Sequence, residues 1–222
     1  MHTRRYHHGD LRAALLARAE ETLRERGPGA LSLRELARDL GVSHAAPSRH
    51  FKDKQALLDA LALAGFDRLV EVLTGARGAG GAFSDRLAAL ARAYVDFATA
   101  NAELLDLMFA VKHDPAASLA LLEAVQRAVA LAEELIADGQ RTGEVRQGPV
   151  DRISAPVFTT LHGFAGLAVS CRYSAEETAA GLDDVLAYMV RGCAPEGGGV
   201  PLPEPRPGRG TGLGRVDQRQ ES

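Results

Sequence analysis

At 222 residues, the chain is long enough for one large domain or for a small domain joined to a larger one. Aromatic residues make up only 5% of it and tryptophan is absent, a composition that argues against a β-sandwich and favours helices. The net charge of −3 is unevenly divided. Residues 1–54 carry 11 lysines and arginines against 7 acidic residues (+4), whereas the remainder carries 15 against 22 (−7). The basic part therefore points to a nucleic-acid partner, with ordinary scatter of charge as the alternative.

Targeting signals and metal-type cysteine spacings are both missing from the sequence. No run of 18 apolar residues occurs, so we expect no membrane span. The basic start at residues 1–8 leads into no apolar signal core, so we expect no export. Cys171 and Cys193 show no metal-ligand spacing, which fits a reduced, cytoplasmic protein without a disulfide framework.

The first two helices are predicted from their capping signals. Asp10 is placed to cap a helix over 11–26, which a Gly-Pro-Gly segment ends. Residues 32–35 read Ser-x-x-Glu, a capping box for a short second helix. This helix stops at Gly41, because glycine suits the left-handed residue that follows a helix end.

Two more helices complete a compact N-terminal unit, which we expect to occupy residues 1–54. A third helix over 43–50 begins at a capping serine, and Pro47 falls in its first turn, where the missing N–H costs little. Asp53 caps a fourth helix over 54–76, which leads out of the unit. Two short capped helices separated by a glycine turn are the layout of a helix-turn-helix that binds DNA.

Beyond a glycine-rich break at 75–81, every signal is helical, so the chain is predicted to be all-α. The expected helices are 84–100 capped by Ser84, 102–111, one opened by Asp114-Pro115 and running to 141, 151–171, and 175–191 opened by a capping box at Ser174–Glu177. Together they make a second, larger helical domain over 55–193. The Pro/Gly-rich segment 194–222 cannot bury a core and is expected to be a disordered tail.

The predicted DNA-contacting residues share short or polar side chains on the third helix or at helix starts. Arg49 and His44 are candidates for hydrogen bonds to bases or phosphates, and the two alanines of the helix allow close approach to thymine methyls. Each residue has a plain structural alternative, in which the serines only cap and Arg49 is only solvated. The set is Ser32, Arg34, Ser43, His44, Ala45, Ala46, Ser48, Arg49, His50 and Lys54.

Two N-terminal features carry weaker predictions. Arg4-Arg5 could enter a minor groove ahead of the first helix, or could belong to a solvated terminus. His7-His8 lack third and fourth ligands at workable spacing, so we expect no metal site.

Residues 31–63 resemble the DNA-binding domain of TetR-family transcriptional regulators. The spacing from Phe51 through Lys54 to the following leucine pair is typical of the passage from the family's recognition helix to its fourth helix. Residues 6–12 resemble one branch of the family, in which Leu161-His162-Gly163 is matched by Trp-His-Gly. Family members commonly carry tyrosine where this chain has Ser48, so phosphate affinity at that position is expected to differ.

The resemblance implies a small-molecule pocket in the larger domain and a homodimer formed by the last two helices. His162 is singled out, because a buried histidine needs a partner, either a ligand or a backbone carbonyl. Core packing is the alternative for every residue of the set. The candidate lining is Phe66, Tyr94, Phe97, Met108, Phe109, Phe158 and His162, with Leu105 and Phe164 beside them. The predicted dimer faces are Val157, Leu161 and Leu167 on one helix and Leu182, Val185, Leu186 and Met189 on the other.

Enzymatic sequence signatures are not found: there is no Gly-x-Ser-x-Gly, P-loop, dinucleotide fingerprint or HExxH. His162 and Cys171 are nine residues apart on one predicted helix and cannot meet there. We therefore expect no catalysis and no cofactor. The preferred hypothesis is a homodimeric repressor that binds a pseudo-palindromic operator and is released by a small apolar effector. A protein-binding adaptor without operator recognition is the alternative, and an enzyme acting on a hydrophobic substrate is a third, weaker one.

Overall fold

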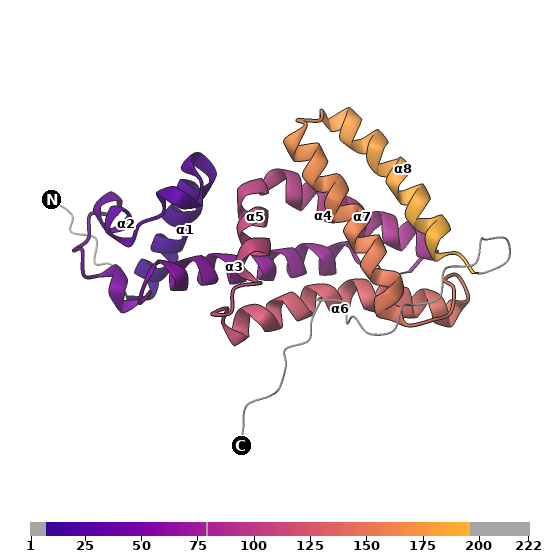
Figure 1. The fold of residues 1–222 in the computed structure, drawn as a ribbon, viewed down its shortest axis with the longest axis horizontal. Coiled ribbons are helices and arrows are strands. Elements are labelled where there is room, and N and C mark those ends of the chain that lie inside the picture. Colours follow the sequence, from indigo (N-terminus) through magenta and orange to yellow (C-terminus); the bar gives the residue numbers. More distant parts are fainter. Residues whose placement is uncertain (1–7, 79, 196–222) are drawn as a thin grey trace, which may run out of the picture.

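The computed structural model describes residues 8–78 and 80–195, and within these ranges the fold is entirely helical (Figure 1). The predicted tail and the features at Arg4-Arg5 and residue 7 lie outside the described residues. The helices are α1 (His8–Arg26), α2 (Leu33–Asp39), α3 (Lys54–Ala76), α4 (Phe83–Ala100), α5 (Ala102–Val111), α6 (Leu119–Thr142), α7 (Val150–Ser170) and α8 (Ala175–Cys193), with two 3₁₀ helices, η1 (Pro28–Ala30) and η2 (Pro47–Arg49).

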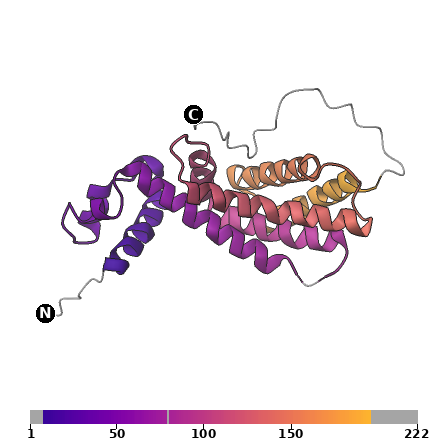
Figure 2. The same cartoon turned by 90° about the horizontal axis from the view of Figure 1, so that it is seen from below.

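Helix α3 runs from the N-terminal helices into the larger helical part of the molecule and connects the two (Figures 1 and 2). It contacts α1 and packs against α4, α5 and α6. Its start is fixed as predicted, since the Asp53 carboxylate accepts a hydrogen bond from the Ala56 N–H at 2.8 Å. We call residues 8–53 the head and residues 83–193 the body. Because α3 touches both, it can transmit a movement of one to the other.

The predicted capping boxes have opposite outcomes. At α8 the box forms: the Glu177 N–H donates to Ser174 Oγ at 3.1 Å, and the Ser174 N–H donates to the Glu177 carboxylate at 2.7 Å. At α2 it does not, because Ser32 makes no side-chain cap bond and Glu35 instead lies 3.8 Å from Arg38. Asp10 is not a cap either, since α1 already begins at His8.

The prediction of a third α-helix over 43–50 is wrong. Residues 44–46 form turns and only Pro47–Arg49 is helical, as the 3₁₀ helix η2. Most bonds there span three residues, as from the Ala46 N–H to the Ser43 carbonyl and from the His50 N–H to the Pro47 carbonyl, and the Phe51 N–H donates to the same Pro47 carbonyl. Pro47 is buried and has no N–H to bond the carbonyl four residues earlier. Its ring thus prevents the α-helical pattern that the capping serine suggested.

Two helices of the body begin elsewhere than predicted. Helix α4 begins at Phe83, one residue before the expected cap Ser84, and its first N–H donates to the Glu144 carboxylate at 2.7 Å. That hydrogen bond is the main cause that lowers the pKa of Glu144. Helix α6 begins at Leu119, capped by Ser118 Oγ at 3.1 Å, and not at the Asp-Pro pair. Other predicted bounds agree within about two residues.

The last turn of α6 is packed so closely that Gly139 has no room for a methyl group. A Cβ at this position would overlap a methyl group of Val145 and approach the Phe83 ring to 3.0 Å. We expect Gly139→Ala to lower the free energy of unfolding, because overpacking costs about 1–3 kcal/mol and outweighs the roughly 1 kcal/mol gained in helix propensity. Gly75→Ala is the matched control, since nothing lies within 4 Å of its Cβ. Urea unfolding measures both, and equal stabilisation of the two variants would contradict the packing.

Candidate nucleic-acid interface and aromatic cluster

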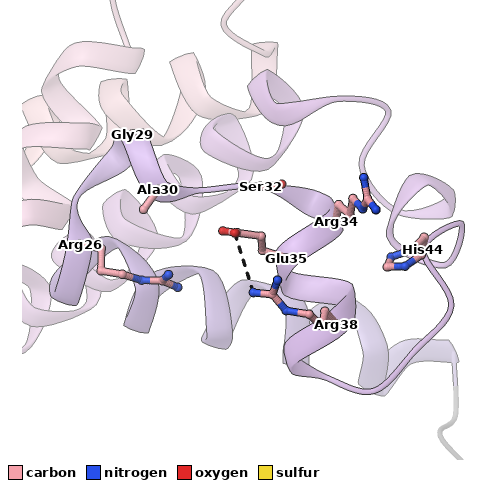
Figure 3. A pocket seen from close by; sticks show the side chains of 8 residues that line it. All are labelled: Arg26, Gly29, Ala30, Ser32, Arg34, Glu35, Arg38 and His44. Carbon is pink, nitrogen blue, oxygen red and sulfur yellow. Dashed lines mark ion pairs between the residues drawn. The ribbon is translucent and has the colours of Figure 1, made fainter.

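An open hollow on the head is lined by three exposed arginines (Figure 3). Arg34 and His44 lie next to each other on one side of it, and Arg26 lies on the other. The complete lining is Arg26, Gly29, Ala30, Ser32, Arg34, Glu35, Arg38 and His44. Three guanidinium groups against one carboxylate make this surface suitable for a phosphate backbone.

The hollow unites three of the predicted DNA-contacting residues, Ser32, Arg34 and His44. Arg26 and Arg38 were not predicted. Arg38 could have been found from its spacing, because positions four apart on a helix share a face and Arg34 was already selected. The others of the set lie on the turn after α2 and at the start of α3, outside the lining.

The predicted DNA-contacting residues differ in how far they are exposed to solvent. Pro47 is buried and anchors the turn, while the polar side chains on either side of it face solvent. Exposed are Arg34, Ser43, His44, Ala45, Ser48, Arg49 and Lys54, and partly buried are Ser32, Ala46 and His50. The turn therefore presents short polar groups and one arginine around an apolar anchor.

Lys54 has a structural role in addition to its charge. Its ammonium donates to the Pro28 carbonyl at 2.9 Å and lies 3.5 Å from the Gly29 carbonyl. These contacts join the first residue of α3 to η1, next to the hollow. An ammonium has three N–H donors, so one remains for a phosphate.

Ion pairs connect the helices of the head to one another and to α3. Arg18 of α1 lies 3.0 Å from Glu21 and 3.0 Å from Asp39 at the end of α2. Arg68 of α3 pairs with Glu20 of α1 at 2.9 Å. Each exposed pair contributes little by itself, so their effect is mainly to fix geometry.

Aromatic rings from α3, α4, α5 and α7 pack together in one cluster. The His162 ring stacks on Phe109 with centroids 4.3 Å apart, and Phe158 lies 5.7 Å from His162 and 6.1 Å from Phe109. Tyr94 meets Phe158 edge-on at 5.9 Å, and Phe66 lies 6.1 Å from Phe109. Five of the seven predicted ligand-lining residues thus lie together. Met108 is also buried but packs toward Gly65, and Phe97 is buried with no ring contact to the cluster.

His162 finds the partner that its burial requires. The Tyr94 hydroxyl lies 2.7 Å from His162 Nδ1. Burial raises the pKa of Tyr94, so the phenol stays protonated. The pKa of His162 is lowered from 6.5, first by burial and then by the nearby Lys112 charge, while the exposed Asp106 acts in the opposite direction. At neutral pH the imidazole is therefore uncharged.

This lowered pKa predicts acid sensitivity. The unfolded chain binds the proton on His162 more readily than the native state, so the free energy of unfolding falls as pH drops through about 6.5 toward the folded pKa. We expect His162→Gln to flatten this dependence between pH 7.5 and 5.5 in urea unfolding. The exposed neighbour of Lys112 supplies the control, His113→Gln, which should keep the wild-type slope. Parallel slopes for all three proteins would contradict the assignment.

The last two helices leave one face uncovered. Most of the residues predicted for dimer contact are buried inside the protomer, namely Leu161, Leu182, Leu186 and Met189. Leu167 and Tyr188 are instead exposed, at 53% and 64%. Helix α7 is long and apolar enough by composition to cross a membrane, with a mean hydropathy of 1.3 over 18 residues, yet only 28% of that window is buried. Among the described residues, Leu167 is the large hydrophobic side chain that α7 exposes, and it lies beside the exposed Gly163 and Gly166.

Comparison with known proteins agrees with this architecture. A family model described as bacterial regulatory proteins, tetR family, matches residues 15–61. A second, described as tetracyclin repressor-like, C-terminal domain, matches residues 87–193. No protein of curated function matches the chain.

Solved structures extend the match over most of the chain. A protein of unknown function from Rhodococcus sp. RHA1 is 44% identical over 86% of this chain and 100% of its own, with a TM-score of 0.79. A tetR-family regulatory protein from Rhodococcus RHA1 is 20% identical over 83% and 97%, with a TM-score of 0.67. The fatty acid degradation regulator FadR from Bacillus halodurans is 17% identical over 81% and 94%, with a TM-score of 0.68, and shares the fold. The chain belongs to the TetR family of transcriptional regulators.

Proposed function

We propose that the protein is a homodimeric, cytoplasmic repressor that binds a pseudo-palindromic operator and releases it when a small effector enters the body. The observation that carries the proposal is the exposed polar turn at 43–49 beside the arginine-lined hollow. Residues 1–54 would form the DNA-binding domain and residues 55–193 the effector-binding and dimerisation domain, with α3 linking them.

The uncovered face of α7 and α8 supports dimerisation. Thr159, Gly163, Gly166 and Ser170 are exposed and follow one another at helical spacing along α7, with Leu167 beside them. Small residues allow helices to approach closely, and a two-fold axis would place the same stripe on both sides of the contact. Two heads held in this way can occupy successive major grooves about one helical turn apart.

Two hydrogen bonds support a route from the body to the head. The loop after α5 contacts the first two turns of α3: Gln55 Nε2 donates to Asp114 at 3.1 Å, and the Ser118 N–H donates to Asp59 at 2.8 Å. Lys54, adjacent in sequence, holds η1. An effector that moves α5 would shift the loop and, with it, the start of α3. Release then requires that the effector bind the DNA-incompetent arrangement more tightly.

One observation favours a second candidate, a helical adaptor that binds protein instead of DNA. Residues 44–50 form a turn and a 3₁₀ helix where an α-helix would enter a major groove, and Ser48 replaces the family's usual tyrosine. Selection of bound duplexes from a random pool separates the two functions. A repressor enriches an inverted repeat with half-sites about 10 base pairs apart, whereas an adaptor enriches nothing.

A further inference from the structure

Lys112 is a half-buried cation without an anionic partner among the described residues. It follows the last residue of α5, and its ammonium lies 4.1 Å from the centroid of the Phe109 ring. No carboxylate lies within 4 Å of it and no acceptor takes a hydrogen bond from it in residues 8–78 and 80–195. An ammonium shielded from water in this way is available to an incoming anion.

The same Phe109 ring carries a second polar group. His162 stacks on it, and Tyr94 holds Nδ1 of that imidazole at 2.7 Å. When the protonated phenol donates to Nδ1, the imidazole proton resides on Nε2, which has no partner in the described part of the chain. Phe109, Phe158 and His162 are each only partly buried, so part of each residue is accessible to solvent.

We propose that the effector is an aromatic organic anion, a planar ring system bearing a carboxylate or sulfonate. Its rings would join the stack of Phe109, Phe158 and His162, and its anionic group would pair with the Lys112 ammonium. This inference rests on the proposed effector site and replaces the purely apolar effector expected from sequence. Because Lys112 leads directly into the loop that contacts α3, charge pairing there also places the ligand at the start of the route to the head.

Two fluorescent probes that differ only in charge test the proposal without DNA. 8-Anilinonaphthalene-1-sulfonate carries the sulfonate, and N-phenyl-1-naphthylamine is its neutral counterpart. We expect the full-length protein to bind the sulfonate about tenfold more tightly, with one site per protomer, because only the sulfonate can form a charged hydrogen bond with the Lys112 ammonium. Lys112→Met should abolish this preference and leave the Kd of the neutral probe unchanged.

Matched variants make the result specific. Lys112→Arg should keep the preference, and Lys52→Met, which removes the same charge from an exposed position of the head, should leave both Kd values at wild type. The proposal is overturned if neither probe binds, if both bind equally, or if Lys112→Met retains the preference. If Lys112→Met retains the preference, the role of Lys112 is only to stabilise the C-terminal end of α5 through its charge. These measurements do not involve DNA, so a protein without operator recognition could still pass them, and a repressor could fail them.

Discussion

Gly163→Arg is expected to convert the protein to a monomer and to weaken its binding to the selected operator by two orders of magnitude or more. Gly163 lies in the middle of the exposed α7 stripe, and no atom of the described residues lies within 4 Å of a Cβ built there. The variant protomer should therefore fold normally. Two opposed arginines would, however, separate the paired helices and bring like charges together. Loss of the second head removes an avidity factor of roughly 10²–10⁴.

Sedimentation velocity and operator titration measure this prediction together. Gly75→Arg is the control, since that glycine is equally exposed on α3 and equally free of neighbours. It should remain dimeric and bind the operator as the wild type does. A Gly163→Arg protein that sediments as a dimer with unchanged affinity would place the protomer contact elsewhere.

Arg49→Ala should produce the second large effect, a loss of affinity for the selected operator of about 30-fold or more. Arg49 is exposed on the turn, and no carboxylate lies within 4 Å of its guanidinium among the described residues. An arginine that contacts a base edge contributes about 1–3 kcal/mol, and a dimer loses two of them. Arg141→Ala removes the same charge from the far end of α6, where it pairs with Asp138 on the surface. The Arg141→Ala control should bind the operator with wild-type affinity. Wild-type affinity of Arg49→Ala as well would show that the turn does not face DNA.

The helical fold was predictable where a local signal is complete. The cap bonds of Asp53 and of the Ser174–Glu177 box each involve residues no more than three apart in sequence. Both predicted helix starts, of α3 and of α8, are confirmed. Ser32 carries the same local pattern, but its side chain makes no cap bond, and Glu35 lies 3.8 Å from Arg38. At η2 the hydroxyl cap and the proline ring act in opposite directions, and the proline decides the backbone.

The candidate sites depended on contacts between distant segments, which limits prediction from sequence. Tyr94 and His162 are 68 residues apart and both were selected, but their hydrogen bond follows only from the packing of α4 on α7. Lys112 was not selected, since its place 4.1 Å from the Phe109 ring centroid depends on how the chain leaves α5. Four of the residues predicted for dimer contact, Leu161, Leu182, Leu186 and Met189, lie in the protomer's own core, because core residues have the same helical periodicity as a dimer face. Leu167, from the same prediction, is exposed. Assignment to the branch with Trp-His-Gly stays a prediction.

Titration of the selected operator at several salt concentrations, beside a scrambled duplex of equal length, tests the central claim most directly. The account predicts that the operator binds at least 10³-fold more tightly than the scrambled duplex at physiological salt. It also predicts that log K for both duplexes falls linearly with log salt, with a slope set by the phosphates that the two heads neutralise. Equal affinity for the two duplexes, or a slope near zero, would contradict DNA recognition by the head.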